Sequence, residues 1–488
     1  MISKDQIKLI EKMITAEMIR EGTPGLSIGI VKENELIYTA TFGSSNLTKR
    51  TPVSQNTLFV LASVTKSFIG MGILKLSELN KLKLDDPIAK YLPLDDFEHS
   101  ELAKTITIHH LLTHSSGIPN ISDGLNMQQL LLDYNFEDPV PSVPFASWDD
   151  VFRLVNSVAD SLIDPPGKKF YYNNLGYSLL VKIIEEVSGS TISEFMKKNI
   201  FEPLEMLETD FGTFEMFKNE NLTEFYVDNK DGKQIQIKPD DRYTGDLWFG
   251  PGGLISSVPQ LANYMIMLFN KGTFKGKRII SEENISRSFT QHFVETFPYE
   301  EFYNFYGQYG QTGYGYGFVI QKDFFGRTLV HHSGSSLGAS SWFAMLPEQK
   351  LGVIILCNKH PSPRMFAHAV LMVMLNINPY QKFPILKLRS ILSKLEGKYE
   401  TFNGLSKLEV INSNNVLSIT FLPSKEKIRL IALKSFEEND KQFPFYVQTP
   451  IGGKKPIVFE KSENNNVWLH IERNKYRKLS KLIKKIKE

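Results

Sequence analysis

The sequence predicts an α/β (α+β) protein in which an antiparallel sheet is flanked by helices, followed by a smaller all-β domain. Two apolar β-type runs near the N-terminus flank a polar turn, a mainly helical middle follows, and further β-type runs come close together late in the chain. After Pro379 the pattern changes to short alternating runs separated by Asn, Lys and Gly, which is typical of a sandwich or barrel. We therefore expect one sheet assembled from both ends of the first domain.

The chain has 488 residues, more than one typical domain. The change in pattern predicts a first domain over residues 1–378, a partly helical linker over 379–395 and a β-barrel domain over 396–488. The final stretch, 473–488, is strongly basic and carries apolar residues at helical spacing. We expect a solvated terminal helix there, and a helix bound to a membrane or an acidic partner is the alternative.

The expected elements follow the spacing of apolar residues, which is near 3.6 residues in a helix and 2 in a half-buried strand. Helices are expected over 4–20, 63–79, 106–114, 148–159, 176–187, 191–200, 258–269 and 366–375. Strands are expected over 26–31, 36–42, 316–321, 328–331, 340–346 and 351–358, and in the second domain over 407–411, 416–421, 428–432 and 467–471. Residues 118–150 are rich in Pro, Asp and Asn and predict a long surface loop bordering a binding site, whereas 205–245 are polar and give no clear assignment.

The composition is that of an ordinary globular protein, with 42% apolar and 23% charged residues. The net charge of +2 gives no reason to expect a nucleic-acid partner. Residues 1–14 lack the apolar run of a signal peptide, and no stretch has the length and apolar character of a membrane span, so we expect a soluble, cytoplasmic protein. The single cysteine, Cys357, follows an apolar run and is expected to be a core residue rather than a reactive thiol.

The candidate chemistry begins at Ser63-Val-Thr-Lys66, at the front of an apolar segment expected to be helical. The two side chains are three residues apart and therefore lie on one helical face. A serine hydroxyl is a weak nucleophile at neutral pH, and a lysine desolvated by apolar walls has a pKa low enough to accept its proton. The pair is a candidate activated nucleophile, and the alternative is a serine and a lysine on an ordinary helix. A second match, Ser424-Lys-Glu-Lys427, lies in a charged stretch without apolar neighbours.

A second segment, Phe-Tyr-Tyr-Asn-Asn-Leu-Gly-Tyr over 170–177, resembles the Phe-x-Tyr-Ser-Asn-x-Gly-Tyr element of the serine β-lactamase-related family. That family includes class C β-lactamases, D-alanyl-D-alanine carboxypeptidases, D-aminopeptidases and related esterases. A tyrosine near an activated serine can pass a proton to the leaving group, and an asparagine amide can hold a substrate carbonyl or the lysine. The doubled residues leave two registers, and the spacing within the motif selects Tyr172 and Asn174 over Tyr171 and Asn173.

A third segment, His332-Ser-Gly334-Ser335, resembles the His-x-Gly version of the family's Lys-Thr-Gly motif and is expected on a late edge strand. The resemblance implies that His332, Gly334 and Ser335 bind the acyl side of the substrate. It also implies an oxyanion hole formed by the backbone amides of Ser63 and Ser335. His332 replaces the lysine that β-lactamases use to bind the substrate carboxylate, which favours esters or small peptides over antibiotics.

Four lesser signatures extend the resemblance over about residues 10–375, namely 111–117, 250–254, 314–317 and 338–342. His114, in the first of them, is expected to fix a turn, and His109 and His110 are expected to be helix or loop residues rather than ligands. No His-x-x-x-His, Cys pair or carboxylate cluster predicts a metal site, and the resemblance implies no cofactor. The second domain resembles the lipocalin-like domain of some archaeal and bacterial peptidases of the family, which implies oligomerisation or shaped access to the site.

The resemblance implies a serine hydrolase that cleaves an ester or an amide bond through an acyl-enzyme on Ser63. Lys66 and Tyr172 would manage the proton, while Asn174 and His332 would orient a small ester or short peptide, including D-amino-acid peptides. The alternatives are β-lactamase or penicillin-binding activity and a catalytically silent scaffold of the same fold. A homo-oligomer is a further expectation.

Two other readings compete with this one. Gly334-Ser-Ser336-Leu-Gly338 matches the Gly-x-Ser-x-Gly nucleophile elbow of α/β-hydrolases. The elbow requires a following helix, whereas 340–346 is expected to be a strand. The second reading makes the C-terminal barrel a carrier of an apolar ligand that the first domain hydrolyses.

Overall fold

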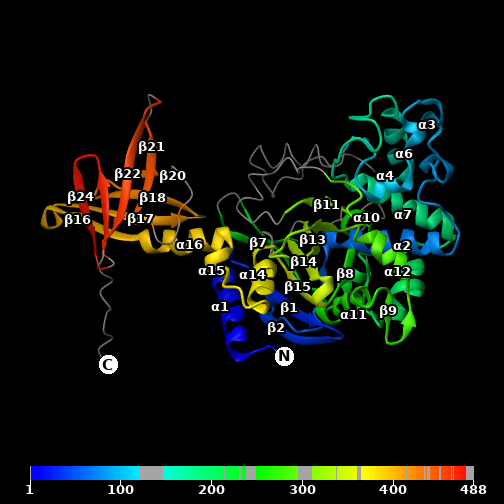
Figure 1. Ribbon diagram of the computed structural model, residues 1–488, viewed down its shortest axis with the longest axis horizontal. Helices are drawn as coiled ribbons and strands as arrows, with labels where there is room; N and C mark the ends of the chain where they lie inside the picture. The colour runs from blue at the N-terminus through cyan, green and yellow to red at the C-terminus, as the bar shows by residue number, and fades with distance from the viewer. Residues whose placement is uncertain are drawn as a thin grey trace. The chain divides into compact units, whose positions relative to one another are not determined.

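The computed structural model describes residues 2–119, 147–213, 215–229, 232–237, 249–294, 310–336, 338–359, 364–413, 415–432, 436, 440–449, 452–462, 464 and 466–479. The described residues up to Leu375 form one compact unit, here called the N-terminal unit. Those from Asn376 onward form a second, the C-terminal unit. Both units are visible in Figure 1.

The N-terminal unit is built around an eight-stranded sheet with the strand order β11-β12-β13-β14-β15-β1-β2-β3. The strands are β1 Gly25–Lys32, β2 Glu35–Asn46, β3 Thr51–Pro52, β11 Thr312–Tyr314, β12 Val319–Gln321, β13 Leu329–Ser336, β14 Ala339–Leu346 and β15 Leu351–Cys357. β1 pairs antiparallel with β15, placing Leu26 opposite Cys357, so strands from both ends of the unit lie side by side. The predicted fold class is confirmed.

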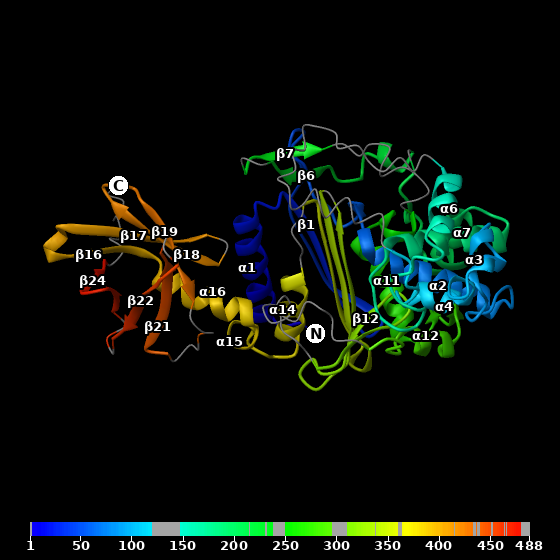
Figure 2. The ribbon, with the colours of Figure 1, turned by 90° about the horizontal axis from the view of Figure 1, so that it is seen from above.

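Helices cover both faces of this sheet, which explains why β14 and β15 are buried along their whole length. Figure 2 shows α1 Lys4–Glu21 and α14 Arg364–Met374 on one side and α11 Val258–Phe269 on the other. Cys357 ends β15 and is buried, and burial raises the pKa of its thiol to about 12. The expectation of a core cysteine is confirmed.

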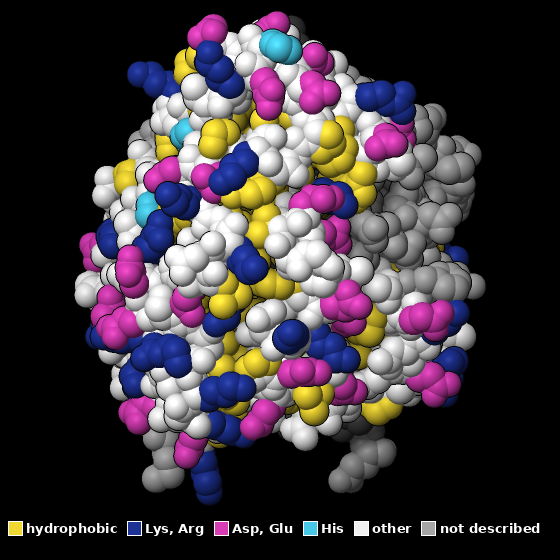
Figure 3. Space-filling view, turned by 90° about the vertical axis from the view of Figure 1, so that its right-hand side faces the viewer, with side chains coloured by type: hydrophobic (Ala, Val, Ile, Leu, Met, Phe, Trp, Pro, Cys, Tyr) yellow, Lys and Arg dark blue, Asp and Glu magenta, His cyan; other side chains and the backbone are white. Residues whose placement is uncertain are grey.

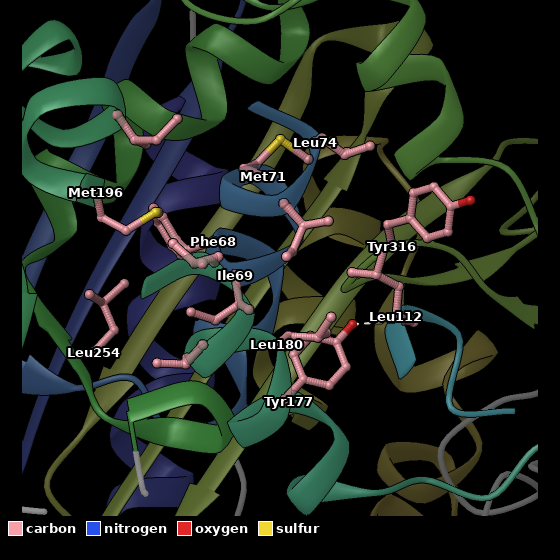
Figure 4. Packing of buried hydrophobic residues seen from close by; sticks show 14 of the residues in the cluster. Phe68, Ile69, Met71, Leu74, Leu112, Tyr177, Leu180, Met196, Leu254 and Tyr316 are labelled. Atoms are coloured by element: carbon pink, nitrogen blue, oxygen red, sulfur yellow. Dashed lines mark hydrogen bonds between the residues drawn. The ribbon is translucent and has the colours of Figure 1, made fainter. Parts of the chain in front are cut away.

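The remaining helices of the N-terminal unit form a helical subdomain around α2. Their bounds are α2 Thr65–Glu78, α3 Asp95–His99, α4 Ile108–Leu112, α6 Trp148–Ser157, α7 Asn174–Ser188, α8 Ile192–Met196, α10 Phe249–Gly252 and α12 Glu282–Ser288, with a 3-10 turn η1 over Ala62–Val64 and a π-helical turn η4 over Lys197–Phe201. Every residue of α2 from Thr65 to Leu74 is buried. A helix that is apolar on all sides belongs in a core. Figure 4 shows Phe68, Ile69, Met71 and Leu74 of α2 among side chains of its neighbours.

Small sheets complete the N-terminal unit. A three-stranded sheet has the order β4-β8-β5, formed by β4 Phe59–Val60, β8 Leu254–Ser256 and β5 Asp210–Phe211. Two further strand pairs are β6 Phe225–Asp228 with β7 Gln234–Ile237, and β9 Thr273–Phe274 with β10 Lys277–Arg278. β5, β6 and β7 fall in the stretch 205–245 that had no sequence assignment. Most of the expected surface loop over 118–150 lies outside the described residues.

The C-terminal unit begins with two helices, α15 Pro379–Lys382 and α16 Pro384–Leu395, and continues as a nine-stranded antiparallel sheet. Its order is β19-β18-β17-β16-β24-β23-β22-β21-β20. The strands are β16 Gly397–Thr401, β17 Ser406–Ser413, β18 Val416–Leu422, β19 Lys427–Arg429, β20 Ile431–Ala432, β21 Gln442–Gln448, β22 Lys454–Lys461, β23 Val467–Ile471 and β24 Asn474–Lys478. Only Leu430 separates β19 from β20, so the chain itself joins the two edges and the barrel is nearly closed.

The interior of this barrel is filled by its own side chains. Tyr399, Leu408, Phe459 and Leu469 are fully buried there, and α16 adds Ile391, Leu392 and Leu395 to the same core. The expected terminal helix is wrong for residues 474–478, which form β24 opposite β23. Alternation explains the strand, because Tyr476 is buried while Lys475 and Arg477 on either side are exposed. Of the later apolar residues of the expected helix, Leu479 donates its backbone N–H to the Lys398 carbonyl at 2.8 Å, and those after it lie outside the described residues.

Charged side chains of both signs are mixed on the face of the molecule that Figure 3 shows. On the face shown in Figure 3, Lys and Arg side chains alternate with Asp and Glu, and neither sign gathers into one patch. None of the helices in the described ranges combines the length and apolar character needed to cross a membrane.

Candidate active site

Ser63 and Lys66 meet where η1 runs into α2. Lys66 Nζ lies 3.0 Å from Ser63 Oγ and donates to the Pro251 carbonyl at 2.7 Å. The Lys66 side chain is fully buried, whereas Ser63 is partly exposed. Burial disfavours the charged form of an amine, so the α2 core provides the desolvation that the sequence predicted for this lysine.

The backbone directly before Ser63 is strained. Ala62 has a φ of 46°, in the left-handed region that non-glycine residues rarely adopt. It persists because its surroundings hold it: the Leu61 N–H donates to the Leu254 carbonyl at 2.8 Å, and a Cβ at Gly252 would lie 3.3 Å from the Ala62 Cα. Strain of this kind concentrates at functional sites. Nothing local in the sequence signals it.

The signature over 250–254 packs against the start of α2, which carries Lys66. Its Pro251 carbonyl accepts the hydrogen bond from Lys66, and the Leu254 N–H donates to Thr65 Oγ1 at 3.1 Å. A Cβ at Gly250 would lie 2.2 Å from the Tyr177 carbonyl oxygen of α7. Glycine therefore lets this loop touch α2 and α7 at once.

The second motif lies beside the lysine. Lys66 Nζ is 4.9 Å from the centre of the Tyr172 ring. The residues on either side of Tyr172 bind nearby groups. The Tyr171 hydroxyl donates to Asp164. The Asn173 side chain caps α7 by accepting from the Gly176 N–H. In the structure it is thus Tyr172, and not Tyr171, that faces Lys66.

Asn174 is the first residue of α7 and is partly exposed. Asn173, by contrast, is buried, and its amide also donates to the Ile118 carbonyl at 2.8 Å. The two asparagines therefore have different surroundings, and only Asn174 retains access to solvent. The register selected from motif spacing, Tyr172 with Asn174, stays a prediction.

His332 of the third motif is buried and neutral. Its Nε2 accepts from the Tyr314 hydroxyl at 3.0 Å, and its Nδ1 donates to the Ser333 carbonyl at 2.7 Å. Burial lowers the pKa of His332 to about 3. The centres of the His332 and Tyr172 rings are 6.3 Å apart, so the second and third motifs adjoin. Both ring nitrogens are already engaged.

Gly334 brings β13 against the serine. A Cβ at Gly334 would lie 2.0 Å from the Leu61 carbonyl oxygen, and the Ser341 hydroxyl of β14 donates to that same oxygen. Only glycine fits here. The next residue, Ser335, is exposed. The third motif therefore runs directly past η1.

The expectation that this motif lies on an edge strand is wrong. β13 is interior in the sheet, between β12 and β14. β12 is short, however, and pairs only with Leu329–His331. The motif half of β13, from His332 to Ser336, extends past β12, and its strand partner among the described residues is β14. Pairing order depends on contacts distant in sequence, which the motif itself does not encode.

The nucleophile-elbow alternative does not fit the structure. Ser336 pairs with Ala339 at the end of the β13–β14 hairpin, and β14 then continues to Leu346. An elbow places its serine between a strand and a helix. The strand expected after Ser336 is present, and the helix that the elbow needs is not formed by residues 339–346.

The three histidines at and before the first signature differ in environment. His109 Nδ1 lies 2.9 Å from the Tyr316 hydroxyl, and His110 Nδ1 accepts from the Thr107 N–H at 3.1 Å. His114 is buried next to Tyr172. Within the described residues, no three His, Cys, Asp or Glu side chains are arranged to hold a metal ion.

Sequence reasoning did not assign roles to two residues of this site. Tyr314 donates to His332, and Pro251 accepts from Lys66. Both lie in stretches that the sequence marked as lesser signatures, 314–317 and 250–254. The signal for them existed as glycine-rich patterns, but the partners of each side chain or carbonyl could be identified only from the fold.

Two solved structures resemble the chain, one of them over nearly its whole length. The octameric penicillin-binding protein homologue from Pyrococcus abyssi matches with a TM-score of 0.76 and 31% identity, over 97% of this chain and all of that one. A penicillin-binding protein from Bacillus halodurans, 24% identical, matches 74% of this chain and 98% of its own with a TM-score of 0.56, which supports the fold alone.

Curated relatives match part of the chain. Protein flp of Staphylococcus aureus (strain N315) is 26% identical over 370 residues, covering 75% of this chain and 66% of its own length. Penicillin-binding protein 4* of Bacillus subtilis (strain 168) is 32% identical over 183 residues, 36% of this chain and 35% of that protein. This chain thus spans less than two thirds of the length of either relative.

Two family models match the chain in succession. Residues 379–477 match the Pab87 octamerisation domain. Residues 10–373 match the β-lactamase family and contain the Ser63, Tyr172 and His332 motifs. Since that model covers well over half of the sequence, the chain belongs to the β-lactamase family, with an octamerisation-type domain at its C-terminal end.

Proposed function

We propose that this protein is a serine hydrolase that cleaves a small ester or amide through an acyl-enzyme on Ser63. The observation that carries the proposal is the 3.0 Å approach of Lys66 Nζ to Ser63 Oγ, with the amine buried and the serine accessible. A desolvated amine is a suitable base for a serine hydroxyl. Membership of the β-lactamase family supports serine hydrolysis in general.

In the proposed reaction, Ser63 Oγ attacks the carbonyl carbon while its proton passes to the neutral amine of Lys66. The amides of Ser63 and Ser335 stabilise the negative oxygen of the tetrahedral intermediate. Tyr172 relays the proton to the leaving alkoxide or amine as the bond to carbon breaks. Water then attacks the carbonyl carbon of the acyl-enzyme. Its proton passes through Tyr172 and Lys66 to Ser63 Oγ as the bond to that oxygen breaks, and the carboxylic acid is released.

The surroundings of His332 favour substrates that are uncharged on the acyl side. A lysine at this position would supply a cation for a carboxylate, whereas His332 is neutral and has both nitrogens engaged. We therefore propose esters and small peptides or D-amino-acid amides as the substrate class. Esters have the better leaving group and are expected to react faster.

Penicillin binding is the second candidate function. It is supported by the names of similar proteins, among them the penicillin-binding protein homologue from Pyrococcus abyssi. Against penicillin binding stands the neutral His332, which supplies no cation for the carboxylate of a penicillin. Turnover or covalent capture of a chromogenic cephalosporin, compared with acetate esters and D-alanine amides, separates the two.

The nucleophile is tested by intact-mass analysis after incubation with a fluorophosphonate. The wild type is expected to gain one adduct, which Ser63→Ala abolishes and Ser336→Ala retains. Lys66→Arg is expected to slow labelling by at least about 100-fold, because a guanidinium keeps its proton and cannot act as the base.

Three outcomes would contradict the proposal. An adduct lost only in Ser336→Ala would place the nucleophile on β13. Labelling of Lys66→Arg at the wild-type rate would remove the lysine as base. No adduct in the folded wild type, with no turnover of any substrate above, would favour a catalytically silent scaffold.

We also propose that the protein is a homo-oligomer. The match of residues 379–477 to an octamerisation domain and the octameric state in the name of the Pyrococcus abyssi homologue support this. The C-terminal unit, with its packed barrel core, is the proposed site of assembly.

A further inference from the structure

We propose that His114 is the positioning residue for Tyr172, an inference that rests on the proposed function of Tyr172 in proton transfer. His114 binds the chain on both sides of that tyrosine. Its carbonyl accepts the Tyr171 N–H at 2.8 Å, and its ring Nδ1 accepts the Asn173 N–H at 3.0 Å. The backbone that carries Tyr172 is therefore held by two hydrogen bonds to one residue.

The imidazole also packs on the phenol ring itself. The centres of the His114 and Tyr172 rings are 4.3 Å apart, with an angle of 35° between the planes. The rings of Phe170, Tyr177 and Tyr314 surround His114 at 5.6, 5.0 and 4.7 Å. Aromatic packing of this kind limits the rotamers of Tyr172, in addition to the two backbone contacts.

The tautomer of His114 follows from its contacts. Because Nδ1 accepts a hydrogen bond, the proton of the neutral ring is on Nε2, which is buried and has no hydrogen-bond partner in the described part of the chain. Burial holds the pKa of His114 well below its usual value. A neutral ring keeps Nδ1 available as the acceptor.

The backbone of the first signature is shaped to make these contacts. His114 has a φ of 57°, and the turn that follows continues to bind the segment before Tyr172. The Ser115 carbonyl accepts the Gly167 N–H at 2.8 Å, and the Gly117 carbonyl accepts the Ile163 N–H at 2.9 Å. The turn over 114–117 is thus docked along residues 163–173, and His114 is its contact with the tyrosine.

A misplaced Tyr172 would affect some substrates more than others. Its proposed task is to deliver a proton to the leaving group. A 4-nitrophenolate leaves without that proton, whereas an alkoxide does not. Loss of the position should therefore slow acylation by alkyl esters far more than by 4-nitrophenyl esters. General damage to the fold would slow all esters by the same factor.

The test is a series of acetate esters with 4-nitrophenol, phenol and ethanol as leaving groups, with kcat/KM measured because it reports acylation. Tyr172→Phe and His114→Phe are each expected to lower kcat/KM about 100-fold for the ethyl ester and less than about fivefold for the 4-nitrophenyl ester. The double variant is expected to be no worse than Tyr172→Phe. His114→Asn keeps an acceptor and tolerates positive φ, and is expected to recover about tenfold of the loss.

His110→Phe is the matched control. His110 lies in α4, directly before the signature, and its Nδ1 also accepts a backbone N–H, that of Thr107 at 3.1 Å, but its ring contacts and hydrogen bonds within the described residues do not include Tyr172. Any effect of His110→Phe is expected to be equal across the three esters. Thermal unfolding of each variant shows that the compared proteins are folded.

An equal fall of kcat/KM across the ester series in His114→Phe would overturn the proposal. If the wild type hydrolyses no ester and takes up no fluorophosphonate on Ser63, the proposed function has failed instead. The positioning claim is then decided by a crystal structure of His114→Phe. A displaced Tyr172 ring would support it, and an unmoved ring would overturn it.

Discussion

A single carbonyl oxygen, that of Leu61, limits how closely the first and third motifs approach each other. The Leu61 carbonyl oxygen, one peptide before the strained Ala62, accepts from Ser341 and also lies where a side chain on Gly334 would begin. The position of the nucleophile and the position of β13 are therefore coupled through one oxygen. This coupling sets the spacing between the two proposed oxyanion amides.

Gly334→Ala tests that coupling. The added Cβ would lie 2.0 Å from the Leu61 carbonyl oxygen, so η1 or β13 must shift. We expect labelling of Ser63 by a fluorophosphonate to slow at least about 100-fold, because displaced donors no longer meet the oxyanion. Gly176→Ala is the control, since its Cβ would make only ordinary contacts, the nearest 3.7 Å from Leu111. Labelling of Gly334→Ala at the wild-type rate would remove β13 from the proposed oxyanion hole.

The buried histidines predict how stability depends on pH. The pKa of His332 is lowered to about 3 in the fold, whereas an unfolded histidine titrates near 6.5. Between these values the unfolded chain binds a proton that the folded chain does not. The contribution of neutral His332 to the free energy of unfolding is therefore fully present above pH 6.5. As the pH falls below 6.5, this contribution decreases by about 1.4 kcal/mol per pH unit.

Chemical unfolding of the wild type and of His332→Gln at pH 7, 6 and 5 measures this slope. The variant is expected to be less stable at pH 7 but to lose less stability on acidification. His99→Gln changes a histidine at an exposed position and is expected to keep the wild-type slope. Equal slopes in all three proteins would contradict the neutral, buried state of His332.

At the scale of elements, the sequence predicted best where periodicity was strong and local. The helix expected over 4–20 is α1, Lys4–Glu21, and the helix expected over 258–269 is α11. β14 and β15 follow their apolar runs, because strands covered on both faces have no polar alternation to obscure them. The union of strands from both ends of the unit was also predicted, because the N-terminal hairpin and the late β-type runs both need a common core.

Elements governed by distant contacts were not predictable. The positive φ of Ala62 depends on Leu254 and Gly252, far along the chain, and its own neighbours carry no glycine or asparagine signal. Within the basic tail, residues 474–478 form β24 instead of the expected helix because pairing with β23 buries Tyr476 in the barrel. The sequence was enough to locate the three motifs, but not to identify the distant atoms that contact them.

For the whole molecule, the two units have separate cores. The N-terminal unit is organised around the eight-stranded sheet and α2, and the C-terminal unit around a barrel interior that includes α16. The two edge strands of the barrel sheet, β19 and β20, are joined by a single residue, Leu430, which leaves no long open edge between them. Separate cores allow one unit to be destabilised while the other keeps its fold.

That separation makes the proposed assembly testable with two matched cavities. Leu469 and Leu261 are both fully buried, the first in the barrel core and the second in α11. Truncation of either to alanine is expected to cost about 2–5 kcal/mol in its own unit. Light scattering of the full-length wild type should give a mass several times the 55.7 kDa of one chain. Leu469→Ala is expected to lower that mass and Leu261→Ala to preserve it, whereas a monomeric wild type, or loss of assembly only in Leu261→Ala, would contradict assembly through the C-terminal unit.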